Sequence, residues 1–127
     1  VGQALRHEPI TVYGDGSQTR TFGHVSDIVR AMLLTMSTDK TWGQVYNFGG
    51  LSEISVRDLA KLIIGKTQSR SEIQFISFEK AYDADFEDMQ RRVPDLTKIK
   101  SAVGYEPTKD IHAIIDDVVA FERARMG

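Results

Sequence analysis

Three stretches of this chain repeat apolar residues at the three- and four-residue spacing of an α-helix, which limits the folds open to it. Each stretch begins beside a polar residue suited to capping a helix: Ser26 or Asp27, then Ser55 with Asp58 three residues later, then Asp110. We therefore predict three amphipathic helices, each with one apolar face to bury. The stripes are Ile28, Val29, Met32, Leu33 and Met36; Val56, Leu59, Ala60, Ile63 and Ile64; and Ile111, Ile114, Ile115, Val118 and Val119.

Short apolar segments around these helices predict β-strands. Residues 10–13 are followed by a Gly-Asp-Gly turn, a hairpin signal, so residues 19–25 are predicted to be the returning strand. Residues 44–48 and 73–78 predict further strands, the second of them buried because it is apolar on both faces. Residues 79–94 predict a loop, and residues 95–103 a short helix ended by Gly104. With 127 residues, the chain is expected to form one domain of mixed α/β (α+β) structure.

Composition excludes several classes of partner. The 16 basic and 18 acidic residues give a net charge of -2, whereas broad nucleic-acid binding needs a basic excess. There is no cysteine, which excludes disulfides and thiolate metal sites and is compatible with the reducing cytoplasm, the expected location. The three histidines are scattered without the spacing of a zinc site, so no metal is expected. No apolar run approaches the roughly 20 residues that span a bilayer, so no membrane partner is expected.

Four segments, in order, resemble the C-terminal half of extended short-chain dehydrogenase/reductases that act on nucleotide sugars. They are residues 9–32 (PITVYGDGSQTRTFGHVSDIVRAM), 45–50 (VYNFGG), 54–63 (ISVRDLAKLI) and 86–111 (FEDMQRRVPDLTKIKSAVGYEPTKDI). The chain is most similar to UDP-sugar 4-epimerases, UDP-glucuronate decarboxylases and dTDP-glucose dehydratases. This resemblance implies that residues 1–127 form the small nucleotide-sugar-binding C-terminal domain of such an enzyme.

The resemblance also shows what the chain lacks. The family binds NAD on an N-terminal Rossmann domain through a GxxGxxG loop, and a Tyr-x-x-x-Lys pair serves its hydride chemistry. Tyr105 and Lys109 have that spacing, but Pro107 disrupts the helix that normally carries the pair. We therefore expect no catalytic residue and no cofactor site here, and no activity from this chain alone. Because it also begins without methionine, we expect a fragment whose missing half holds NAD.

The same resemblance implies five substrate-binding residues. Arg20, in a Gln-x-Arg segment, corresponds to an arginine that reaches the substrate diphosphate, which suits the fork of donors on a guanidinium. Arg92, two residues before a proline, corresponds to a second substrate-contacting arginine. The backbone of Val12 and Tyr13 corresponds to a strand that pairs with the uracil edge. Phe86 falls where some decarboxylases have a substrate-facing tyrosine, so it lacks that hydroxyl.

The parent reaction expected from this resemblance is 4-epimerisation of a UDP-sugar. UDP-glucuronate decarboxylation and dTDP-glucose 4,6-dehydration stay open, as does a stand-alone, non-catalytic module that binds nucleotide sugars. The expected partners are a UDP-sugar or related nucleotide sugar and the missing Rossmann domain. Surfaces that pack on that domain would be exposed apolar patches without it, so a homodimer is also expected.

Overall fold

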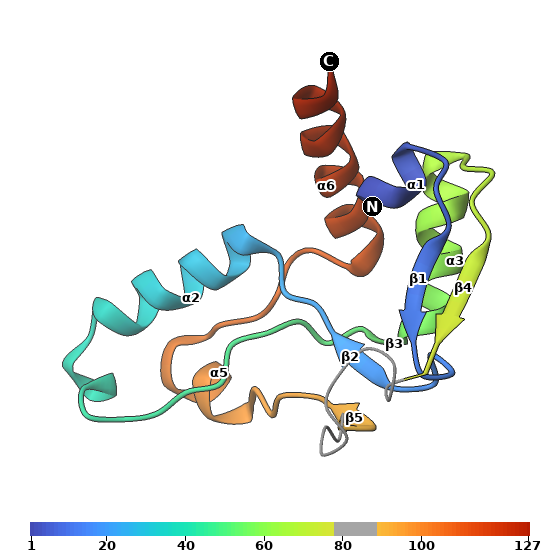
Figure 1. The fold of residues 1–127 in the computed structure, drawn as a ribbon. Helices are drawn as coiled ribbons and strands as arrows, with labels where there is room; N and C mark the ends of the chain where they lie inside the picture. The colour runs from blue at the N-terminus through green and yellow to red at the C-terminus, as the bar shows by residue number, and fades with distance from the viewer. Residues whose placement is uncertain (78–88) are drawn as a thin grey trace. The chain divides into compact units, whose positions relative to one another are not determined.

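The computed structural model describes residues 1–77 and 89–127 of the chain. Their contacts divide the chain into two compact units: Val1–Arg20, Ile54–Arg92 and Ile115–Gly127 form the first, and Thr21–Glu53 and Val93–Ile114 the second. The described elements, in chain order (Figure 1), are α1 (Gly2–Leu5), β1 (Ile10–Tyr13), β2 (Thr19–Thr21), α2 (Val25–Met36), the 3-10 helix η1 (Asp39–Thr41), β3 (Glu53–Ser55), α3 (Val56–Thr67), β4 (Ile73–Ile76), β5 (Arg91–Arg92), α5 (Thr97–Val103) and α6 (Ile111–Met126).

The first unit is organised around a parallel pair of strands. β1 and β4 lie side by side, with Ile10 opposite Ile73 and Tyr13 opposite Ile76. Parallel strands need a crossover connection, and α3 lies on that connection and packs on β1 (Figure 1). Val12 is only 2% exposed at this contact, so it anchors the small core of the unit.

The predicted hairpin is wrong. β1 pairs with β4, while β2 lies between β3 and β5 in a separate three-stranded sheet. The Gly-Asp-Gly turn does bend the chain, since Gly14 and Gly16 both have positive φ values, but its carbonyls face α3 instead. The Gly16 carbonyl accepts from the Arg57 N–H at 3.0 Å, and the Gln18 carbonyl accepts from the Val56 N–H at 3.0 Å. The first turn of a helix leaves its backbone N–H groups without partners in the helix, and these two bonds satisfy two of them in α3. The bonds to α3 therefore decide the direction of the chain after the turn, in place of the hairpin that the local sequence favours.

The three amphipathic helices are confirmed as α2, α3 and α6. Two predicted caps are confirmed as well: Ser55 Oγ and Asp110 Oδ1 each accept from the backbone N–H three residues on, at 3.0 Å and 2.8 Å. The cap predicted for α2, at Ser26 or Asp27, is wrong. The cap is His24, whose Nδ1 accepts from the Ser26 N–H at 3.2 Å.

The remaining predictions are confirmed in part. The short helix is α5, and Gly104 ends it with a φ of 68°. The strand predicted at 73–78 is β4, but it is not buried, because the Phe75 side chain is 49% exposed. The predicted loop 79–94 contains β5, whose two residues pair with β2, and its residues 79–88 lie outside the described ones. Residues 44–48, predicted as a strand, form none and pair with no strand in the described part of the chain.

The core of the second unit is built around Tyr105. Tyr105, Ala31, Leu96 and Ile99 are buried together, and the phenol donates to the Gly49 carbonyl at 3.0 Å. Burial raises the pKa of this phenol, and the negative charge of Asp27 raises it further, so the hydroxyl keeps the proton that it donates.

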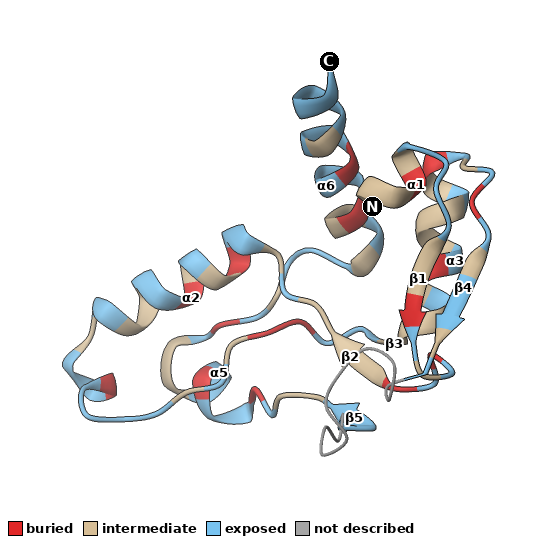
Figure 2. Ribbon diagram, in the orientation of Figure 1, coloured by how far each residue is buried: buried red, intermediate tan, exposed pale blue. Residues whose placement is uncertain are grey.

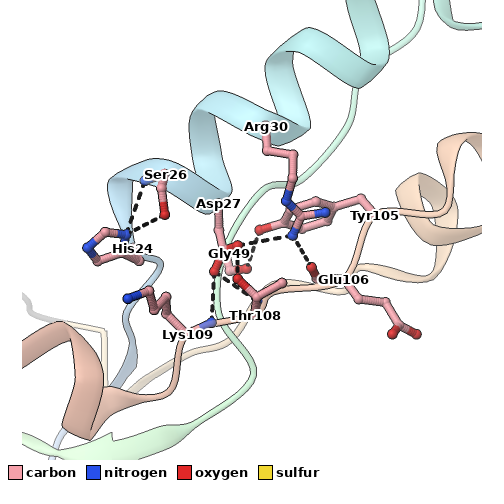
Figure 3. A network of polar contacts seen from close by, with 9 residues as sticks. All are labelled: His24, Ser26, Asp27, Arg30, Gly49, Tyr105, Glu106, Thr108 and Lys109. Atoms are coloured by element: carbon pink, nitrogen blue, oxygen red, sulfur yellow. Dashed lines mark hydrogen bonds and ion pairs between the residues drawn. The ribbon is translucent and has the colours of Figure 1, made fainter.

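Asp27 links the start of α2 to a segment far along the chain (Figure 3). Its Oδ2 accepts from the backbone N–H groups of Thr108 and Lys109, at 2.9 Å and 3.0 Å. Its Oδ1 accepts from the Thr108 hydroxyl at 2.7 Å and from Arg30 Nη2 at 3.0 Å. Arg30 also donates to the Glu106 carbonyl and lies over the Tyr105 ring, 5.3 Å from its centroid. Asp27 is only 1% exposed, and both of its carboxylate oxygens have hydrogen-bond partners, as a buried charge requires.

These partners decide the charge of Asp27. Burial alone would raise the pKa of the carboxyl group, because it disfavours the ionised form. The hydrogen bonds from the Thr108 hydroxyl, Arg30 and the two backbone N–H groups outweigh burial and hold the pKa far below its usual range. The folded state therefore favours the ionised carboxylate.

Asp27→Asn should lower the free energy of unfolding by about 2–4 kcal/mol near pH 7, because an amide nitrogen would meet donors where an oxygen now accepts. The pKa of Asp27 is lower in the folded than in the unfolded state. Its stabilisation is therefore present above the unfolded pKa of about 4, is lost as the pH falls below it, and should be missing from the variant. Urea titrations from about pH 7 to about pH 3 measure both effects.

Asp58→Asn is the matched control, since Asp58 is a solvent-exposed carboxylate in the first turn of α3 and should give a much smaller change. Equal stability losses for the two variants would contradict the role assigned to Asp27.

Candidate functional site

Two predicted arginines lie on neighbouring strands. β2 and β5 are parallel, with Thr19 opposite Arg91 and Arg20 opposite Arg92. Side chains alternate between the faces of a strand, and residues in register share a face. Arg20 and Arg92 therefore leave the same face of the sheet, on strands about 4.8 Å apart, and Arg91 leaves the opposite face.

The guanidinium of Arg20 is held by backbone oxygens. Its Nη1 donates to the Thr19 carbonyl at 2.7 Å and to the Met89 carbonyl at 2.8 Å. These carbonyls orient the Arg20 guanidinium, and the Arg92 side chain that leaves the same face is exposed. Like charges on adjacent strands repel each other. An anion bound by both arginines would relieve that repulsion, so the arrangement has the character of an anion-binding site.

Val12 and Tyr13 end β1 just before the turn that leads to Arg20. The Val12 side chain is buried against α3, and the Tyr13 side chain is partly exposed. The Tyr13 carbonyl accepts from Gln18 Nε2 at 3.0 Å. Gln18 is itself buried and was not predicted from the sequence, where a single glutamine after a glycine turn carries no signal. Phe86 lies outside the described residues.

Arg57, which was not predicted from the sequence either, holds the turn that follows β1. Its Nε donates to the Asp15 carbonyl at 3.0 Å, its Nη2 donates to the same oxygen, and its guanidinium lies over the Phe75 ring. The turn is therefore fixed to α3 by side-chain as well as backbone bonds. A basic residue in the first turn of a helix, where acidic residues are favoured, is the only sequence signal that could have indicated it.

The described residues show no cofactor loop of the dinucleotide type. Gly14 and Gly16 lie between two strands, whereas a dinucleotide loop joins a strand to a helix. Within residues 1–77 and 89–127, no three acidic or histidine side chains gather where a metal ion could bind. None of the described helices has the length and apolar character needed to cross a membrane.

The chain matches, over residues 1–118, a family model described as GDP-mannose 4,6 dehydratase. It therefore belongs to this family of NAD-dependent nucleotide-sugar epimerases and dehydratases, which confirms the family predicted from the sequence.

Two curated relatives are decarboxylases. The UDP-N-acetyl-alpha-D-glucosaminuronate decarboxylase of Bacillus cytotoxicus is 40% identical over 104 residues, which cover 82% of this chain and 32% of the relative. The UDP-glucuronic acid decarboxylase 1 of Danio rerio is 37% identical over 119 residues, which cover 94% and 27%. The chain thus spans about a third or less of the length of these relatives.

Two solved structures share the fold. The UDP-glucose 4-epimerase of Thermotoga maritima, solved with UDP-glucose, matches 99% of this chain and 38% of its own with a TM-score of 0.86 and 28% identity. MoeE5, solved with UDP-glucuronic acid and NAD, matches 98% of this chain and 40% of its own with a TM-score of 0.84 and 30% identity. The small α/β fold therefore matches part of extended short-chain dehydrogenase structures.

Proposed function

We propose that this chain is the nucleotide-sugar-binding C-terminal portion of a longer NAD-dependent enzyme, and that Arg20 and Arg92 together bind the substrate diphosphate. The observation that carries this proposal is the register of β2 and β5, which places the two arginines side by side on one face. A diphosphate carries several negative oxygens, and guanidinium groups match their geometry with paired donors. The UDP-sugars bound in the two solved relatives support this assignment.

The other three residues fit the same ligand. The backbone of Val12 and Tyr13 would read the edge of the base, with the Tyr13 carbonyl already positioned by Gln18. Phe86 would lie against the sugar. Because each contact uses the backbone or an apolar ring, none of these three residues adds a charge to the arginine pair.

Support for the missing half comes from residues 44–50 in the second unit. Tyr46 and Phe48 pack against the core, whereas Val45 before them is 82% exposed and Asn47 between them is exposed. This alternation is that of a β-strand, yet the segment pairs with no strand in the described part of the chain. An unpaired strand is completed by the edge of another sheet, and we assign that edge to the NAD-binding half. NAD held by that half would supply the hydride acceptor and donor for the sugar chemistry.

For the reaction, we favour decarboxylation of a UDP-hexuronate over the 4-epimerisation expected from the sequence. The two decarboxylases share 40% and 37% identity with the chain, whereas the UDP-glucose 4-epimerase structure shares 28%. The 4-epimerase is the second candidate, because Phe86 lacks the hydroxyl that some decarboxylases place there.

Arg92→Ala and Arg20→Ala should each weaken UDP binding by about ten- to a hundredfold, the worth of a charge-assisted hydrogen bond. Isothermal titration calorimetry of the chain with UDP measures the loss. Arg91→Ala is the matched control, since it removes the neighbouring charge from the opposite face of β5. An equal loss in the Arg91 variant would show that general charge, and not the paired face, attracts the nucleotide.

The longer enzyme that contains this chain should convert UDP-glucuronate to a UDP-pentose and carbon dioxide, with NAD unchanged at the end of each cycle. Chromatography of the products with a carbon dioxide assay measures this outcome. A product that retains the carboxylate and has the opposite configuration at carbon 4 would instead support the epimerase.

The chain on its own should form homodimers at micromolar concentration. Much of α2 is exposed (Figure 2), and its exposed residues include the apolar Val29, Leu33 and Met36. Leu33, 62% exposed, is the middle one of these three, so Leu33→Lys should shift the mass toward the monomer. Light scattering measures the mass, with Lys40→Gln as a control in the neighbouring 3-10 helix. A wild-type chain that is monomeric at this concentration would contradict the expectation.

A further inference from the structure

A groove of about 900 Å³ lies in the first unit, between α3 and β4. Asp15 lines it from the turn after β1, Arg57 and Lys61 line it from α3, and Ile73 and Phe75 line it from β4. This volume is within the range of small-molecule sites, which combine apolar walls with a few polar groups. Of the predicted substrate-binding residues that the structure describes, Val12, Tyr13, Arg20 and Arg92, none lines this groove.

The apolar wall of the groove is one face of β4. Ile73 and Phe75 are two residues apart and in register with Ile10 and Val12, so all four side chains leave the face on which α3 packs. α3 covers Val12 but leaves the Phe75 ring half exposed. An exposed aromatic ring on a strand is a surface on which a flat ligand ring can stack.

The positive charge of the groove is held in place by Arg57. Its Nε and Nη2 donate to the Asp15 carbonyl, and its guanidinium lies 5.5 Å from the centroid of the Phe75 ring. These contacts fix the guanidinium without neutralising it. Its Nη1 makes no hydrogen bond to any other described residue, so its donors are available to a ligand.

Lys61 adds a second cation on the same side of α3, because residues four apart share a helix face. Its Nζ lies 3.2 Å from Asp58 Oδ1, and both side chains are exposed, so this ion pair is weak and open to exchange. Two carboxylates lie close by as well: Asp15 Oδ1 accepts from the Ser17 N–H, and Asp58 Oδ2 accepts from the Ser55 hydroxyl. An incoming anion can therefore exchange with Asp58 at Lys61 and accept from Arg57 as well.

The geometry points to a further ligand site in this groove, for a small molecule that joins a flat ring to an anionic group, such as a nucleoside monophosphate. The ring stacks on Phe75 and contacts Ile73, and the phosphate accepts from Arg57 Nη1 and Lys61 Nζ. This site does not depend on the function proposed for Arg20 and Arg92.

Titration of the chain with AMP tests the site, with adenosine and inorganic phosphate as partial ligands. AMP should bind saturably, and each partial ligand should bind at least about tenfold more weakly, because each makes only half of the contacts. Lys61→Gln should weaken AMP binding by about tenfold and Phe75→Leu by about threefold to tenfold. Both side chains are exposed enough for the variants to fold, and thermal melts by circular dichroism check this. Arg57 is left unchanged because it also holds the turn.

Two controls separate this groove from the arginine pair. Lys98→Gln, on α5 in the second unit, should leave AMP binding unchanged. Arg92→Ala should weaken UDP binding but not AMP binding, and Lys61→Gln should do the reverse. The proposal is overturned if AMP fails to saturate below about 10 mM, if the Lys61 and Phe75 variants bind AMP as wild type does, or if Arg92→Ala abolishes AMP binding.

Discussion

The second unit depends on one buried carboxylate. Asp27 lies in the first turn of α2, and its hydrogen bonds hold the backbone of Thr108 and Lys109, between α5 and α6. A buried charge is tolerated only when its oxygens are satisfied, so these bonds fix where the later segment runs. Arg30 extends the same contact to the Tyr105 ring and the Glu106 carbonyl. The path of the chain into α6 therefore follows from the first turn of α2.

Local sequence patterns predicted the helices correctly, but they did not predict which strands pair with each other. Amphipathic spacing and the Ser55 and Asp110 caps are properties of neighbouring residues, so the sequence alone was sufficient for α2, α3 and α6. Strand partners depend on residues far apart in the chain, which is why the hairpin was wrong and the two-residue β5 was missed. Residues 44–48 have the alternation of a strand but no partner in the described part of the chain, so the pattern alone produced no sheet.

For the candidate site, too, the sequence indicated single residues but not which of them lie together. The resemblance supplied Arg20 and Arg92, but only the register of their strands shows that they share one face. Asp27 was misread as a cap, although it is one turn from the buried Ala31, and a polar residue on the buried side of a helix is a recognisable signal. Gln18 gave no such signal, because its role depends on the carbonyl of Tyr13 across a turn.

The brevity of β5 has a thermodynamic consequence. Its two residues pair with β2 through few backbone bonds, and the pairing brings two positive charges together. A ligand that neutralises both arginines binds the paired strands more tightly than the separated ones. By linkage, it stabilises the pairing by about RT ln(1 + [L]/Kd), roughly 2.7 kcal/mol at a hundredfold excess over Kd. For any such ligand, binding and the local folding of β5 are then one coupled equilibrium.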